Sequence, residues 1–228
     1  MPAAFSLLVT AAGAIALAGL WRRQQRAGAG SRAAFFHDCR GALEGSQIVS
    51  HDREYPFLRG SHRGRRVRAT AFSETLNVRK LPCLWLSLDI DAPLGFAETI
   101  SIMARPSGAE FYSPFADLPY RVEAAGILPP HAIAKSNVPI TVYKLGALAS
   151  AAPLFDDPRV KELVLRKSGL RLIWRLDEAE RGTYLLFRQS DFKVKRLERG
   201  VLETVLAQAS NLLDALAPDV AGQRQRSG

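Results

Sequence analysis

The chain has 228 residues, of which 47% are hydrophobic and 23% charged, and its formal net charge is +9. This composition is typical of a folded globular chain and excludes a collagen-like or intrinsically disordered protein. The two cysteines, Cys39 and Cys83, are too few for a disulfide scaffold, and their separation in sequence matches no common metal-binding motif.

The positive charge is concentrated toward the N-terminus. Residues 1–80 hold thirteen Lys and Arg against five Asp and Glu, so eight of the nine excess charges lie there. A nucleic-acid-binding domain more often carries its positive charge on the folded body. We therefore do not expect nucleic acid to be the main partner.

The first predicted element is a transmembrane anchor over residues 1–21. No side chain from Pro2 to Trp21 is ionisable, and these 20 residues are about enough for a helix to cross a hydrocarbon core of roughly 30 Å. The residues that would mark the membrane interface are Trp21, Arg22, Arg23 and Arg26. The positive-inside bias places these arginines in the cytoplasm and the short N-terminus outside.

Two other interpretations of this segment stay open. Ala16–Ala18 forms an A-x-A-like site that is typical of a cleaved signal peptide, but no basic residue precedes the apolar core. A buried helix of a soluble protein is the third interpretation, although no polar face recurs at helical spacing. The charge that follows the apolar run favours the uncleaved anchor.

Residues 22–46 are predicted to form a basic juxtamembrane segment that contains a short helix. Ser31 can cap a helix that runs to about Leu43, where Gly41 and Gly45 weaken and end it. Basic side chains next to a bilayer are attracted to anionic lipid by about 1 kcal/mol each. The bilayer itself, and possible anionic headgroups within it, are thus the first expected partners.

Residues 47–217 are predicted to form a cytoplasmic α+β domain. Alternation of apolar and polar residues predicts strands over 55–59, 65–72, 83–90, 99–105, 120–122, 163–166, 170–176 and 183–188. A loop with a short helix is expected over 126–148. An amphipathic helix over 197–216 is expected to end at Pro218, and 218–228 to be a disordered tail.

The order of these elements indicates the fold class. Consecutive strands are joined by turns of hairpin length and do not alternate with helices. We therefore predict an α+β fold in which an N-terminal transmembrane helix precedes a mainly antiparallel sheet, covered on one face by the C-terminal amphipathic helix.

One pair of carboxylates is a candidate site for chemistry. Asp89 and Asp91 share a face at the end of a hydrophobic strand, where a divalent cation or a phosphoryl group could be held. The stretch is similar to the opening motif of haloacid-dehalogenase-like phosphatases, an Asp-x-Asp followed by Gly-Thr. Here Ala92-Pro93 replaces Gly-Thr, and the alternative is that both carboxylates cap a turn.

The densest basic run lies at a predicted hairpin over residues 59–68. Its candidate contacts with anionic lipid headgroups are Arg63, Arg65, Arg66 and Arg68. A solvated hairpin is the plainer interpretation. Nucleic-acid binding is a third, but no stacking aromatics are interleaved with the arginines.

The sequence contains no Walker loop, no dinucleotide-binding glycine motif, no serine-hydrolase motif and no clustered Cys or His ligands. The expected function is a single-pass protein of the cell (inner) membrane with a non-catalytic interaction domain in the cytoplasm, an unknown protein partner and no cofactor. A membrane-tethered hydrolase or phosphoryl-transfer enzyme that uses Asp89 and Asp91 is the alternative.

Overall fold

The computed structural model describes Gly19 and residues 32–50, 54–74, 81–95, 97–108, 110–140, 145–187 and 190–224. The predicted anchor therefore lies outside the described residues, apart from Gly19, as do Trp21 and the three arginines that follow it. None of the helices in the described ranges combines the length and the apolar character that a membrane crossing requires.

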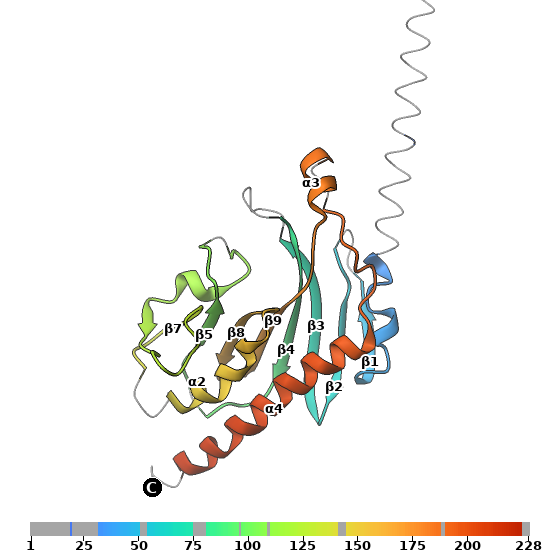
Figure 1. Cartoon of the computed structure of the whole chain (residues 1–228). Helices are drawn as coiled ribbons and strands as arrows, with labels where there is room; N and C mark the ends of the chain where they lie inside the picture. The colour runs from blue at the N-terminus through green and yellow to red at the C-terminus, as the bar shows by residue number, and fades with distance from the viewer. Residues whose placement is uncertain are drawn as a thin grey trace, which may run out of the picture.

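The domain is built on a nine-stranded sheet in which every strand pairing among the described residues is antiparallel. The strands are β1 (Glu44–Val49), β2 (Phe57–His62), β3 (Arg65–Glu74), β4 (Cys83–Asp91), β5 (Ile100–Ala104), β6 (Tyr120–Val122), β7 (Ala132–Ser136), β8 (Val160–Arg166) and β9 (Gly169–Glu178). Their order across the sheet is β1-β2-β3-β4-β9-β8-β5-β7-β6. The mainly antiparallel α+β class is thus confirmed (Figure 1).

The hairpin β8–β9 is inserted into the middle of the sheet, between strands from the first half of the chain. β4 and β8 can occupy central positions because nearly all of their side chains are buried. The first residue of β9 must be a glycine. Gly169 has φ +147°, and a Cβ atom there would lie 2.0 Å from the carbonyl oxygen of Ile90.

The helices are α2 (Leu145–Ala151), α3 (Arg181–Phe187) and α4 (Arg199–Arg224), with 3-10 turns η1 (His37–Cys39), η2 (Pro114–Asp117) and η4 (Ala152–Asp156). α4 lies diagonally across one face of the sheet, with α2 beside it (Figure 1). The apolar stripe of α4 is fully buried at Leu202, Val205, Leu206 and Ala209. This confirms the predicted covering of one face by the C-terminal helix.

Two predictions about helices were wrong, one toward each end of the chain. The helix expected from Ser31 to Leu43 is reduced to short turns around η1, which bury Phe35, Phe36 and Cys39 together rather than along a single helical face. β1 then begins at Glu44. At the other end, Pro218 does not end α4, which runs to Arg224, although a proline inside a helix lacks a backbone donor and its ring crowds the carbonyl four residues earlier.

Two further differences concern strands. β7 lies within the stretch predicted as a loop. Its alternation of apolar and polar residues is too short to predict a strand, and the strand forms by pairing with β5 and β6. Residues 183–188 were predicted as a strand, but α3 occupies 183–187, and residue 188 lies outside the described residues. Both edges of β9 are already paired, with β4 and β8, so a strand directly after β9 had no free edge of β9 to join.

Candidate binding groove

The face of the sheet opposite α4 is only half covered. The connection between β5 and β6 crosses it, and the Tyr112 ring packs against Phe72 and Trp85 at centroid distances of 5.1 and 6.1 Å. The uncovered half forms an open groove of about 930 Å³, which we call the arginine groove. Its principal lining residues are Gln47, Phe57, Arg59, Arg66, Arg68, Thr70, Asp89, Asp91, Tyr112 and Arg171.

A single row of residues across five strands forms the floor of the arginine groove. Cross-strand pairing places its members next to one another in the order Gln47, Arg59, Arg68, Asp89 and Arg171. Arg66 and Asp91 lie two residues along, on the same face. The groove thus holds four arginines against two aspartates and carries an excess positive charge.

Arg59 and Arg68 are directly opposite each other on β2 and β3. Like charges in this position destabilise a sheet. Neither arginine has a carboxylate within ion-pair distance among the described residues: Arg59 donates to the side-chain oxygen of Gln47 at 2.7 and 3.1 Å, and Arg68 lies over the Phe57 ring at 4.0 Å. Their charges are therefore oriented but not neutralised within this part of the chain.

The two carboxylates that the sequence singled out lie in the groove, and both are engaged. Asp89 Oδ1 accepts from Arg171 Nε at 2.8 Å, and Asp89 Oδ2 accepts from Ser87 Oγ at 3.2 Å. Asp91 is paired with Arg66 at 3.0 Å. Within the described residues no group of three or more His, Cys, Asp or Glu side chains is arranged to hold a metal ion.

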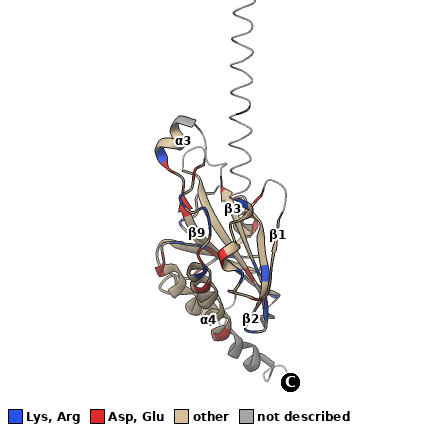
Figure 2. Cartoon of the chain, turned by 90° about the vertical axis from the view of Figure 1, so that its right-hand side faces the viewer, with Lys and Arg blue, Asp and Glu red and all other residues tan. Residues whose placement is uncertain are grey.

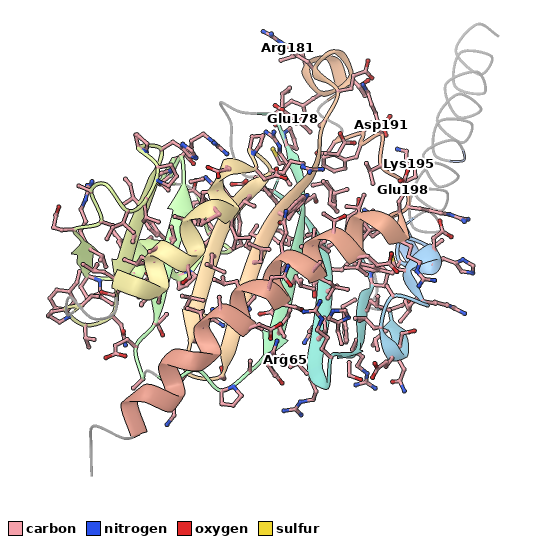
Figure 3. The ribbon with its side chains drawn as sticks, turned by 60° about the horizontal axis from the view of Figure 1, so that its bottom comes forward. Arg65, Glu178, Arg181, Asp191, Lys195 and Glu198 are labelled. Carbon is pink, nitrogen blue, oxygen red and sulfur yellow. The ribbon has the colours of Figure 1, made fainter. Side chains whose placement is uncertain are left out.

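The predicted lipid-binding run is divided between two places. Arg66 and Arg68 face the arginine groove, whereas Arg63 and Arg65, at the tip of the β2–β3 hairpin, are paired with Asp214 of α4 at 3.0 and 2.8 Å (Figure 3 labels Arg65). The hydrogen bond from Arg65 is the main cause that lowers the pKa of Asp214 below its ordinary value. Two of the four arginines thus tie the hairpin to the helix.

A buried polar cluster holds the wall of the groove in place. Lys161 Nζ lies 2.8 Å from Glu110 Oε1 and also donates to the carbonyl oxygens of Ala104 and Arg105. Burial opposes ionisation of Glu110, but hydrogen bonds from Lys161 and Ser107 outweigh it and lower the pKa of Glu110 to about 2.

The neighbouring carboxyl behaves in the opposite way. Glu162 is fully buried and accepts from the hydroxyls of Ser101 and Ser113, yet burial dominates and raises the pKa of Glu162. Ser113, directly after Tyr112, is the N-cap of η2. Sequence reasoning did not single out Glu110, Lys161 or Glu162, because isolated charges at these positions form no motif.

Comparison of the sequence with protein-family models and with curated proteins finds no match to either. The function is therefore argued from the geometry of the groove and from the sequence.

Proposed function

We propose that the protein is a single-pass, membrane-anchored binding module whose arginine groove accepts an acidic segment of a protein partner, without catalysis. The observation that carries this proposal is the juxtaposition of Arg59 and Arg68. A carboxylate between them would receive charge-assisted hydrogen bonds from both guanidinium groups and would relieve their mutual repulsion.

The surroundings of the groove favour a protein partner over a nucleic acid. Asp89 and Asp91 line the same groove and would repel a continuous phosphate backbone. The ring of Tyr112 is packed against other aromatics and is not free to stack on a base. Phe111, the neighbour of Tyr112 in the chain, is 76% exposed, and an exposed aromatic is typical of an anchor for a protein partner.

The ion pairs of the aspartates support a binding role over phosphoryl transfer. Attack by Asp89 on phosphorus would require its carboxylate to leave Arg171 and Ser87, and Asp91 would have to leave Arg66 to reach a cation. The alternative enzyme remains testable: hydrolysis of p-nitrophenyl phosphate with Mg²⁺ that is lost in Asp89→Asn would favour it over the binding module.

The membrane part of the proposal is supported by the sequence of residues 1–26. The uncharged run is about as long as a bilayer crossing, and Trp21 with the arginines after it has the order expected at a cytoplasmic interface. The proposal places the folded domain in the cytoplasm.

The test is a binding titration with the full chain in nanodiscs of phosphatidylcholine. The probe is a short fluorescent peptide rich in Glu and Asp, with its Gln and Asn counterpart as the neutral control. We expect the acidic peptide to bind and the neutral one not to. Binding should fall with added salt, because the Debye screening length falls from about 8 Å at 0.15 M ionic strength to about 3 Å at 1 M.

Paired variants locate the binding site. Arg59→Gln with Arg68→Gln should weaken binding about a hundredfold or more, since hydrogen bonds to charged groups contribute about 1.5–3 kcal/mol each. Arg63→Gln with Arg121→Gln removes the same charge outside the groove and should leave affinity nearly unchanged. Equal losses in the two pairs, or tighter binding of a single-stranded oligonucleotide, would contradict the proposal.

A further inference from the structure

α3 stands apart from the rest of the domain. It follows β9 and projects beyond the end of the sheet, as Figures 1 and 2 show from two directions. Its base is fixed: Ala179 and Phe192 are buried, the amide of Ala179 donates to Pro82, and the amide of Glu180 donates to Asp191. The projection is therefore built into the fold at both of its ends.

The projecting helix exposes one large apolar side chain among its described residues. Leu185 is 57% exposed, and the sequence of α3 continues with Leu186 and Phe187. An exposed leucine by itself is ordinary, but an apolar sequence at the tip of a protrusion is typical of a segment that contacts a membrane or a partner.

The position of α3 indicates that it contacts the membrane rather than a protein partner. The described chain begins at the same end of the sheet as α3. The ring of Phe35 packs on Tyr55, which lies just before β2. The carbonyl oxygen of Phe35 accepts from the amide of Leu197, which follows the α3 protrusion. The basic hairpin tip with Arg65 lies at the opposite end (Figure 3). Residues 22–31, ten in number, can span at most about 35 Å between the predicted anchor and this end.

We propose that α3 is a second membrane contact, which inserts its apolar tip into the bilayer surface and holds the domain with the β2–β3 hairpin pointing away from it. This inference rests on the anchor of the proposed function. Charges at the base of α3 are mixed: Arg181 and Lys195 are exposed beside Glu178 and Asp191, and Lys195 is paired with Asp191 (Figure 3). The contact is thus apolar, and it should need neither anionic lipid nor low salt.

The test places an environment-sensitive dye on α3 in the full chain. In a Cys83→Ser background, in which Cys39 stays buried, Leu185→Cys is labelled and reconstituted in phosphatidylcholine liposomes with or without nitroxide-bearing lipids. Arg63→Cys, at the exposed hairpin tip, is the matched control. We expect the label at position 185 to lose most of its fluorescence to the lipid quencher, and the label at position 63 to keep its own.

The outcomes separate this inference from the proposed function. An unquenched label at position 185 in chains that resist carbonate extraction would overturn the α3 contact and leave the anchor intact. A label shielded from iodide but not quenched by lipid would overturn it as well, because protein would then cover α3. Release of the chain by carbonate would overturn the anchor, and the α3 contact with it.

Discussion

At the scale of single residues, the ion pair between Glu110 and Lys161 stabilises the segment that forms the wall of the groove. Both side chains are almost fully buried, and the pair holds the β5–β6 connection against β8, next to Tyr112. Because the folded-state pKa of Glu110 lies at about 2, below its ordinary value of 4.5, ionisation of Glu110 stabilises the folded state above about pH 4.5. This contribution is lost as the pH falls from about 4.5 toward 2.

We predict that Glu110→Gln lowers the free energy of unfolding, and does so by about 2 kcal/mol more at pH 7 than at pH 3. The measurement is denaturant unfolding of both chains in detergent at the two pH values. Glu123→Gln, which changes an exposed carboxylate directly after β6, is the control and should cause no such difference. A Glu110→Gln penalty that is independent of pH would show that the pair is not ionised as described.

At this scale the sequence predicts faces better than partners. The two-residue period was enough to put Asp89 and Asp91 on one face of their strand, and both line the groove. That Arg66 and Arg68 line the same groove follows from the pairing of β3 with β4. The ion-pair partners of such side chains could not be predicted, because they are distant in the sequence. Arg171 is 82 residues from Asp89, and Asp214 is 151 residues from Arg63. Only the order of strands in the sheet brings such residues together.

Among the elements, α4 gives the most direct test of the core. Leu206 is fully buried in the stripe that covers the sheet, and α4 contacts both β4 and β9. Leu206→Ala should lower the free energy of unfolding by about 2–5 kcal/mol, because it removes buried methyl groups and leaves a cavity. Leu206→Asp should prevent folding, since its carboxylate would be buried without a partner.

Thermal melts of the full chain in detergent check this prediction, with Thr204→Ala on the exposed side of α4 as the control. We expect the control to change stability by no more than about 0.5 kcal/mol. An unchanged melting temperature for Leu206→Asp would mean that the stripe of α4 faces a partner rather than the sheet.

Elements with strong local periodicity were predictable, and those that depend on distant pairing were not. In the hairpin β2–β3 and in β4, apolar and polar residues alternate over several positions. In α4, apolar residues recur at helical spacing over several turns. The insertion of β8–β9 between β4 and β5 has no local signature, and it is this insertion that leaves the stretch after β9 to form α3. The prediction of a strand over residues 183–188 failed for that reason.

At the scale of the whole molecule, the proposed anchor and the proposed binding groove are tested separately. The anchor predicts that a reporter active only in the cytoplasm will be active when fused after Gly228, with the full-length chain in the membrane fraction. Western blotting of fractionated cells, together with N-terminal sequencing, checks this. A mature chain that starts at Gly19 would instead indicate a cleaved signal peptide, and an inactive reporter would indicate the opposite orientation.

The most direct measurement on the groove is NMR of the arginine side-chain Nε–Hε groups, in the full chain in nanodiscs, during titration with the acidic peptide. We predict that the signals of Arg59 and Arg68 shift together and saturate at the affinity found by fluorescence. Arg63 and Arg121, outside the groove, should stay unchanged. Shifts at Arg63 and Arg121 equal to those at Arg59 and Arg68, or no shifts at all, would contradict the assignment of the arginine groove as the binding site.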